Sequence, residues 1–557
     1  MRMEKNAMEA NIRIAGEAGQ GVQSAGELLT SAFHEMGLHV FSTQSYMSRI
    51  RGGVNSFDIR ISDEELHSGR EECDILAALT AESFAAEIGK VSRGGVAALD
   101  GDAGPDALSL DMTGAAKEAG GARMVGSVAA GIVFALLGYD SAALKKMMEK
   151  AYEKKGPEAV AGNEAAAEKG AAMAEGHRGI IRTPQPSARS GELYSGSEAV
   201  GLGAATAGVK VVCSYPMTPS TGALTYLASV ADRYRIVVEQ AEDEICAANL
   251  ICGAAYAGAA AMTTTSGGGF ALMAEGLSLA GMLELPIVIM LSQRPGPATG
   301  LPTRTGQEDL LFAVHAGHGE FPKIIYAPGT IGQAYEMTRR AFESAHKFQT
   351  PAIVMTDQFL TDAKKNIPEL PAELDLVDRH IEKAPSADYV RYAVTDSGVS
   401  PRALPGGEAF VVCASDEHTE DGHLTEDLTA RKAMQDKRMR KAALAAAEAM
   451  PPEFYPEPEE TVLLCWGSTY GPCREAVDIL RAKGRKVCMA HFAQVWPVWA
   501  GAGGALEGRR VVSVEGNSTA QFALLLRQCG AISQFDSILR YDGLPFTGAE
   551  IARRFKS

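Results

Sequence analysis

A chain of 557 residues is too long for a single hydrophobic core, so three or four domains are expected. Its hydrophobic content of 46% and charged content of 22% are typical of a soluble globular protein, and its net charge of −16 argues against a nucleic-acid-binding surface. The nine cysteines include no Cys-x-x-Cys pair, which argues against iron–sulfur, structural zinc and other metal sites in this chain. Residues 1–16 contain no apolar segment of signal-peptide length, so we expect a cytoplasmic protein with free thiols.

The first predicted domain begins with a strand, a glycine turn and a helix. Residues 11–15 alternate like a strand, Gly16, Gly19 and Gly21 follow, and residues 22–36 have helical periodicity. Backbone N–H groups at the start of such a helix are free to bind a phosphate. The spacing is not the full dinucleotide-binding fingerprint, and a tight turn between strand and helix explains it at least as well.

A pair of arginines beside two glycines comes next. Arg49 and Arg51 either bind an anion or are simply part of a turn. A compact α/β domain over residues 1–182 is completed by strands predicted at 57–61, 74–79 and 95–99 and by an apolar helix at 125–137. A linker rich in Ala, Glu, Lys, Gly and Pro then leads to about residue 195.

A second α/β domain is predicted over residues 195–365. Its first strand is followed by a loop that carries Tyr215, Pro216 and Thr218. Open α/β sheets place ligands at the carboxyl ends of their strands, so this loop is a candidate binding segment. Helices are predicted at residues 196–207 and 221–231, and strands at 209–214, 235–239, 260–264, 287–291 and 352–355.

The most informative stretch of this domain places four acids before an uncharged run. Glu239, Glu242, Asp243 and Glu244 precede residues 249–274, which contain no charge. No polar face exists beyond the first helical turn, which predicts a helix buried nearly all round in an α/β core rather than a membrane span. A carboxylate at the start of such a helix either stabilises the helix dipole or acts as a catalytic acid. Composition does not decide between these two roles.

Two later loops add polar groups to this domain. A glycine loop begins with Ser266 and Gly267, and a long loop at residues 293–307 holds Arg294 and Arg304. Long loops in compact domains are often functional. Surface arginines are the alternative reading of the second loop.

The last two segments differ in character. Residues 366–455 are polar and irregular, and Asp416 to His423 contains two histidines and several acids. We favour a solvated loop over a metal site there, because spacing alone does not create convergent ligands. Residues 427–449 predict a basic, alanine-rich surface helix, and residues 456–557 predict a third α/β unit.

Several stretches, in order along the chain, are similar to one family. They are GEAGQGV, SRIRGG, YPMTPST, QAEDEICAANLICGAAYAGA, GFALMAEGLSLAGMLELPIVIM, QRPGPATGLPTRTGQEDLLFA, SDEHTEDGH and EGNSTAQFA. Over nearly its whole length the chain resembles the alpha subunit of 2-oxoacid:ferredoxin oxidoreductases, most closely the 2-oxoglutarate type with the gamma domain fused at its N-terminus. The resemblance implies a multidomain α/β protein: a gamma-type domain (1–182), a pyrimidine-binding-type thiamine diphosphate fold (195–365), an irregular connection (366–455) and a transketolase C-terminal-like domain (456–557).

The resemblance also implies a split active site. In this family a separate beta subunit carries the diphosphate and Mg²⁺ site and a [4Fe–4S] cluster. The diphosphate motif is Gly-Asp-Gly followed by Asn, whose oxygens suit Mg²⁺. Residues 101–104 read Gly-Asp-Ala-Gly, and no Asn lies between residues 56 and 162. We therefore expect a chain that is inactive alone and works as a dimer of alpha–beta units.

The resemblance assigns the activating acid of thiamine chemistry to the acidic stretch. A carboxylic acid that hydrogen-bonds N1′ of the aminopyrimidine favours the tautomer that removes the thiazolium C2 proton, and a raised pKa suits this role. Thiamine enzymes commonly place a glycine nine residues after this acid. Glu244 has Gly253 at that position, so Glu244 is preferred and Glu242 is the fallback.

The resemblance implies substrate roles for two loops. YPMTPST is similar to the family's substrate loop, so Thr218, with Tyr215 and Pro216, is expected to contact the 2-oxoacid. Arg304 is expected to bind the substrate carboxylate, for which a bidentate guanidinium is well suited. A turn-capping threonine and a surface arginine are the alternatives.

Cofactor contacts are implied for two glycine-rich segments. Ser266 and Gly267 are expected near thiamine. The turn from Gly16 to Gly21, with Arg49 and Arg51, is expected to contact coenzyme A or a subunit interface.

The implied reaction converts a 2-oxoacid, coenzyme A and oxidised ferredoxin to acyl-CoA, CO₂ and reduced ferredoxin, as in anaerobic metabolism. The resemblance favours 2-oxoglutarate as the substrate, and no nucleic acid or membrane partner is expected. Two alternatives stay open. One is a self-contained thiamine-dependent lyase or synthase, against which the missing diphosphate motif argues. The other is a non-catalytic scaffold subunit in which Glu244 is a structural dipole acid.

Overall fold

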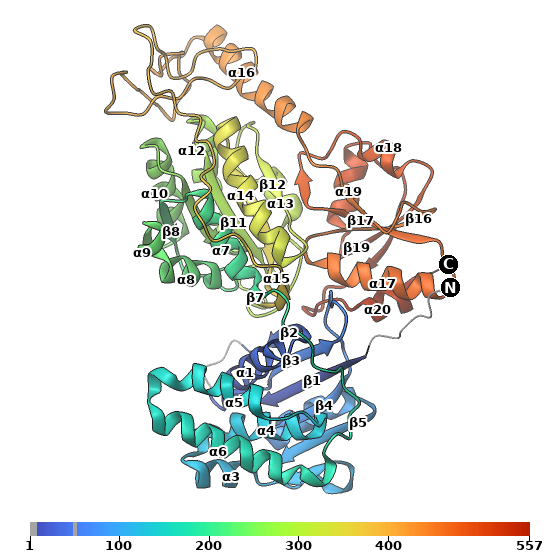
Figure 1. Ribbon diagram of the computed structural model, residues 1–557. Helices are drawn as coiled ribbons and strands as arrows, with labels where there is room; N and C mark the ends of the chain where they lie inside the picture. The colour runs from blue at the N-terminus through green and yellow to red at the C-terminus, as the bar shows by residue number, and fades with distance from the viewer. Residues whose placement is uncertain (1–7, 48–52, 557) are drawn as a thin grey trace. The chain divides into compact units, whose positions relative to one another are not determined.

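The computed structural model describes residues 8–47 and 53–556, which form two compact units (Figure 1). Residues up to 194 belong to the first unit together with residues 362–369, and residues 195–361 and those from 370 onward form the second. The return of residues 362–369 to the first unit was not predicted from the sequence. It is held by Asn366, whose side-chain oxygen accepts a hydrogen bond from the backbone N–H of Val40 at 2.9 Å.

The first unit is built on an eight-stranded mixed sheet with the order β6-β5-β4-β1-β3-β2-β14-β7. β1 pairs antiparallel with β3 and parallel with β4. The strands are β1 (Glu9–Gly16), β2 (His39–Ser45), β3 (Asn55–Ser62), β4 (Cys73–Ala78), β5 (Val91–Asp100), β6 (Leu108–Leu110), β7 (Glu192–Ser195) and β14 (Lys364–Ile367).

Helices complete the core of this unit. They are α1 (Val22–Glu35), α2 (Ala81–Glu87), α3 (Met112–Ala119), α4 (Val125–Leu137), α5 (Ala142–Tyr152) and α6 (Pro157–Met173). All 13 residues of α4 are buried, as its continuous apolar sequence predicts. In the described part of the chain no single helix is long and apolar enough to cross a membrane; residues 112–119 and 122–137 meet that test only as a pair bent by 120°.

The second unit contains a seven-stranded sheet with the order β18-β12-β13-β11-β10-β8-β9. Neighbouring strands from β12 to β9 are parallel, and β18 is antiparallel to β12. β10, β11 and β13 are buried along their whole length, because helices cover both faces of a parallel sheet. The strands are β8 (Val211–Ser214), β9 (Val237–Gln240), β10 (Ala261–Thr265), β11 (Ile287–Gln293), β12 (Ile324–Tyr326), β13 (Ala352–Asp357) and β18 (Gln494–Trp496).

The helices of this sheet follow the parallel α/β pattern predicted from the sequence. They are α7 (Gly196–Ala207), α8 (Thr221–Ser229), α9 (Ala231–Tyr234), α10 (Glu244–Tyr256), α11 (Gly267–Leu272), α12 (Ala274–Met282), α13 (Leu310–His315), α14 (Ile331–Phe348) and α15 (Gln358–Asp362).

A third sheet follows in the same unit, with the order β15-β17-β16-β19-β20. Its strands are β15 (Glu453–Tyr455), β16 (Thr461–Trp466), β17 (Val487–Phe492), β19 (Arg510–Glu515) and β20 (Asp536–Leu539). Its helices are α17 (Tyr470–Ala482), α18 (Ala502–Leu506), α19 (Gln521–Gln528) and α20 (Gly548–Arg554). The three predicted α/β parts are therefore all present.

One helix differs from its prediction. α16 (Leu428–Ala447) was expected to be a surface helix, yet Lys437, Arg438 and Lys441 are buried. The expectation was wrong on this face because Glu284, a buried acid between α12 and β11, binds both lysines, at 2.7 Å and 2.8 Å. Sequence composition does not reveal such a distant partner.

Candidate functional site

The predicted binding segments meet at one edge of the seven-stranded sheet. The loop at Tyr215–Ser220 follows β8, the acidic segment follows β9, the glycine loop follows β10, and the loop from Arg294 follows β11. Because these four strands are adjacent and parallel, their carboxyl ends share one edge. This is the edge at which open α/β sheets bind ligands.

Burial separates the two candidate acids. Glu244 begins α10 and is 3% exposed, whereas Glu242, two residues earlier, is exposed. Oε1 of Glu244 has no hydrogen-bond partner among the described residues. The helix cap is a different acid, because the side chain of Asp243 accepts a hydrogen bond from the backbone N–H of Cys246 at 2.7 Å. Glu244 is therefore a buried carboxylate that capping does not explain.

The glycine segment after β10 was predicted to be a loop, but Gly267 begins helix α11 (Gly267–Leu272), and the first turn of that helix packs on this carboxylate. A Cβ built at Gly269 would lie 2.5 Å from Oε1 of Glu244 and 2.3 Å from Oγ1 of Thr265. Only glycine fits at such a close approach. Ser266 precedes this turn, and its hydroxyl is buried without a partner in the described structure.

An arginine at the start of the long loop connects the segments. Arg294 is 8% exposed, and its guanidinium donates a hydrogen bond to the backbone carbonyl of Thr218 at 2.6 Å. Burial lowers the pKa of Arg294, and the negative charges of Asp309 and Glu244 oppose that shift. The side chain therefore lies in the electrostatic field of the predicted activating acid.

Asp309 is a site residue that the sequence analysis did not identify. Burial raises its pKa to about 6, and its Oδ2 atom has no partner within residues 8–47 and 53–556. A Cβ built at Gly267 would lie 2.3 Å from this Oδ2 atom. No sequence signal distinguishes Asp309 from its neighbour Glu308. Arg294, by contrast, directly follows a buried strand, and that position was a usable signal.

The remaining predicted substrate residues lie in the same loops. Tyr215 is exposed, and Pro216 and Thr218 are half-buried. Arg304 is half-buried and lies beside Gly543 of the third sheet's domain, whose carbonyl accepts a hydrogen bond from the backbone N–H of Thr305 at 3.2 Å. The long loop is therefore fixed between two domains of the second unit.

Gln307 anchors that loop through its side chain. Its amide donates to the carbonyl of Trp466 at 2.8 Å and accepts from the N–H of Gly516 at 2.8 Å, while Asn517 donates to its backbone carbonyl at 3.0 Å. Glu515 beside them is buried and accepts hydrogen bonds from Trp466 and from Asn517 at 3.1 Å and 2.9 Å. The EGNSTAQFA stretch thus holds the loop in place.

The glycine turn of the first unit forms as predicted, between β1 and α1. Gly19 and Gly21 have φ values of 93° and 79°, in the left-handed region. Arg49 and Arg51 lie outside the described residues. A role of this turn in coenzyme A binding stays a prediction.

The segment from Asp416 to His423 does not bring its histidines together. His418 is fully buried and packs on Tyr392 with 4.0 Å between ring centroids, whereas His423 is exposed beside Asp421. The description of the whole segment as a solvated loop was therefore wrong at His418. Within the described residues no group of three or more His, Cys, Asp or Glu side chains has the arrangement of a metal site.

The helix headed by Glu244 is not buried all round, which corrects the sequence prediction. Ile245 and Leu250 are 50% and 42% exposed, and Gly253 is exposed with open space at its Cβ position. Val237 on the edge strand β9 is 61% exposed. No described residue covers these apolar side chains, and exposed apolar groups of this kind are typical of a protein interface. The lack of a polar face therefore does not mean that the whole helix is buried in the core of this chain.

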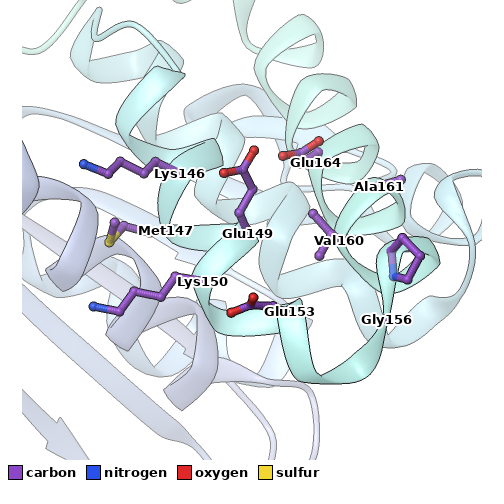
Figure 2. Close-up of a pocket in the computed structure, with 10 residues that line it drawn as sticks. Lys146, Met147, Glu149, Lys150, Glu153, Gly156, Val160, Ala161 and Glu164 are labelled. Carbon is purple, nitrogen blue, oxygen red and sulfur yellow. The ribbon is translucent and has the colours of Figure 1, made fainter.

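A groove of about 660 Å³ in the first unit lies between α5 and α6 (Figure 2). Figure 2 shows Lys146 and Lys150 extending to one side while Glu149 and Glu164 turn toward each other. Lys146 pairs with Glu35. The charges along this groove are mixed and do not converge on one point, so it is not a candidate active site.

Comparisons with known proteins match both units. The family model described as "Pyruvate flavodoxin/ferredoxin oxidoreductase, thiamine diP-bdg" matches residues 202–437, and "Pyruvate ferredoxin/flavodoxin oxidoreductase" matches residues 11–173. The chain is 31% identical to 2-oxoacid:ferredoxin oxidoreductase 2, subunit alpha, of Aeropyrum pernix, over 99% of this chain and 97% of the relative. It is 28% identical to the 2-oxoglutarate oxidoreductase subunit KorA of Mycobacterium tuberculosis, over 97% and 90%.

A solved structure is similar over the whole chain. It is the 2-oxoglutarate:ferredoxin oxidoreductase from Magnetococcus marinus with 2-oxoglutarate, coenzyme A and succinyl-CoA bound. The two chains are 31% identical, with a TM-score of 0.92, and the match covers 98% of this chain and 99% of the other.

Proposed function

Because this chain belongs to the family of 2-oxoacid:ferredoxin oxidoreductase alpha subunits, we propose that it acts on 2-oxoglutarate. The reaction converts 2-oxoglutarate and coenzyme A to succinyl-CoA and CO₂ and passes two electrons to ferredoxin. The M. marinus protein binds 2-oxoglutarate, coenzyme A and succinyl-CoA, which supports this substrate. The single observation that carries a catalytic role is the buried, unpartnered Oε1 of Glu244 at the carboxyl edge of the sheet.

The side chains around Glu244 fit a thiamine ring. Oε1 of Glu244 and the hydroxyl of Ser266 are buried without partners in the part of the chain that the structure describes, and such atoms are costly unless a ligand pairs with them. When bound, thiamine diphosphate supplies the carbon nucleophile for attack on the 2-oxoacid carbonyl. Glu244 would hold the proton shared with N1′ of the aminopyrimidine, and Gly269 leaves the ring edge room to approach.

Arg294 and Arg304 have different roles near the substrate. Arg294 fixes the backbone of the substrate loop at Thr218 and balances the charge of Glu244. Arg304 lies further along the same loop and would bind a carboxylate of 2-oxoglutarate. A bidentate guanidinium selects a planar carboxylate.

A second subunit completes the site in this proposal. The chain lacks the Gly-Asp-Gly diphosphate motif near residue 102, and the relatives are named as alpha subunits. The exposed apolar face of α10, at Ile245 and Leu250, lies on the helix that Glu244 heads and would be covered by that subunit. Leu250→Asp should abolish co-purification with the partner, because it places a charge in an apolar contact. Leu428→Asp, at an 82% exposed position on α16, should not.

The decisive experiment is Glu244→Gln in the assembled complex, measured as 2-oxoglutarate-dependent reduction of viologen with coenzyme A. Activity should fall by roughly 10²-fold or more, the usual loss for a general acid–base group, while the complex still forms. Glu242→Gln is the matched control and should retain activity. Activity of Glu244→Gln close to wild type would instead favour the scaffold role.

The substrate is tested by a panel of 2-oxoacids. Wild type should prefer 2-oxoglutarate to pyruvate, and Arg304→Met should lower kcat/KM for 2-oxoglutarate by about tenfold or more, as expected for a lost charged hydrogen bond. An equal loss of kcat/KM for 2-oxoglutarate and pyruvate would show that Arg304 binds the carboxylate that all 2-oxoacids share. A wild-type preference for pyruvate would reject the proposed substrate.

A further inference from the structure

A cavity of about 400 Å³ lies in the second unit, outside the loops that surround Glu244. Its walls come from the residues just before β12, from α16, from the end of β18 and the segment after it, from the start of α18 and from the turn after α19. All of these elements belong to one compact unit. The volume is within the range of small-molecule sites.

The position of the cavity separates it from the candidate active site. Lys323 and Phe321 line it and immediately precede β12, so they lie at the amino edge of the parallel sheet. The loops around Glu244 leave the carboxyl edge of the same sheet. A ligand in this cavity would therefore occupy a second, separate site.

The walls are mostly apolar and aromatic. Phe321, Trp496 and Trp499 line the cavity together with Met439, and two of the chain's three tryptophans are therefore in its wall. Aromatic side chains offer large, rigid contact surfaces for an apolar ligand.

Lys323 is the one residue of the cavity wall with a formal charge. Its side chain is 7% exposed, and its ammonium lies 4.5 Å from the ring centroid of Phe321. The other buried lysines among the described residues, Lys437 and Lys441, both pair with Glu284. Among the ion pairs of the described residues, none involves Lys323. A buried, unpaired ammonium is unfavourable unless an anion joins it.

The pKa of Lys323 agrees with an anion-binding role. Burial lowers the pKa of Lys323 to about 8, and no neighbouring charge opposes the shift. An anion that enters the cavity would restore the ordinary basicity of the ammonium and would gain a hydrogen bond to a charged donor.

We propose that this cavity binds a small apolar molecule with one negative charge, of the class of aryl or alkyl carboxylates. The aromatic walls of Phe321, Trp496 and Trp499 hold its body, and the ammonium of Lys323 holds its carboxylate. A phosphate ester carries more charge than one lysine neutralises, and the wall contains no arginine, the side chain that commonly binds phosphate in a bidentate manner.

The charge requirement is tested with a matched pair of probes, 4-phenylbutyrate and the neutral 4-phenylbutan-1-ol, titrated into the full chain by calorimetry. The carboxylate should bind more tightly than the alcohol. Lys323→Met should weaken the carboxylate by about tenfold or more and leave the alcohol unchanged, because one charge-assisted hydrogen bond is lost. Lys483→Met, at an exposed position of the same unit, is the control and should bind both probes as wild type does. Equal affinity for the two probes would overturn the proposal.

Protection of cysteines from chemical labelling in the wild-type chain tests where the ligand binds, without the use of a variant. Cys529 lines the cavity and is exposed, and Cys246 is exposed on α10. Saturating 4-phenylbutyrate should slow maleimide labelling of Cys529 several-fold and leave Cys246 unaffected, with both sites quantified by peptide mass spectrometry. Unchanged labelling of Cys529, or equal slowing at both cysteines, would rule out this cavity as the site.

Discussion

Gly269 and Glu244 are in direct contact, since a Cβ at residue 269 would fall 2.5 Å from Oε1 and 2.7 Å from Cγ of the glutamate. Glu244 is the first residue of α10, which follows β9, and Gly269 lies in the first turn of α11, which follows β10. The glycine is therefore required by the shape of the site around the carboxylate and not by helix formation.

Gly269→Ala should lower 2-oxoglutarate-dependent viologen reduction by at least about tenfold, because the methyl group must displace the carboxylate that the reaction uses. Gly268→Ala is the matched control. Its Cβ would meet only the carbonyl oxygen of Ala298, at 3.6 Å, so its turnover should be close to wild type. Similar activity in the two variants would show that the position of Glu244 does not limit the reaction.

Arg294→Lys should raise KM for the 2-oxoacid more than it lowers kcat. The guanidinium holds the carbonyl of Thr218 at 2.6 Å, and a lysine cannot reproduce that geometry while also balancing nearby acids. Steady-state kinetics of the assembled complex measure the split. Arg235→Lys, at an exposed position, is the control, and a pure loss of kcat in Arg294→Lys would contradict a positioning role.

Asp309→Asn should stabilise the chain at pH 7.5 and have little effect near pH 4. Burial raises the pKa of Asp309 in the folded chain to about 6, above its ordinary value of 3.8, so the folded state favours the protonated acid. Its contribution to stability is therefore lost as pH rises from about 4 to about 6, and the charged form costs on the order of 3 kcal/mol above that range. Thermal unfolding of the cofactor-free chain at the two pH values measures the effect, and equal changes in Tm would contradict it.

Glu284→Gln should destabilise the second unit by about 3–5 kcal/mol, because it leaves the ammonium groups of Lys437 and Lys441 buried without an anion. Glu448→Gln breaks an exposed pair with Lys347 and should cost at most about 1 kcal/mol. Denaturant unfolding of the two variants gives the comparison. A loss of less than about 1 kcal/mol in Glu284→Gln would show that water reaches the two lysines.

The same cluster has a defined pH response. Burial alone would raise the pKa of Glu284, but Lys441 and Lys437 outweigh it and hold the pKa well below the ordinary value. The stability that this carboxylate contributes is therefore fully present above its unfolded pKa, near pH 4.5, and is lost only in strong acid. Wild type should lose stability below pH 4 more steeply than Glu284→Gln.

The sequence by itself determined the element order and the general location of the site. Short, mainly apolar runs separated by loops predicted β8, β10, β11 and β13, because strands of a parallel sheet are buried on both faces. Once parallel strands were predicted, the loops that follow them had to share one edge. The strand pattern gave this reason for the loop of Thr218, and the family resemblance assigned Glu244 and Ser266 to the same site.

Only the tertiary structure decided which side chain of each segment faces that region. Glu242 and Glu244 differ by two positions, and packing against Gly269 buries one while the other stays exposed. Arg294 reaches Thr218, and Asp309 joins it, because the loop between them folds back between two sheets. Burial and charge pairing depend on residues that are far apart in the chain, as the pair of Glu284 and Lys437 also shows. Local sequence patterns do not identify such partners.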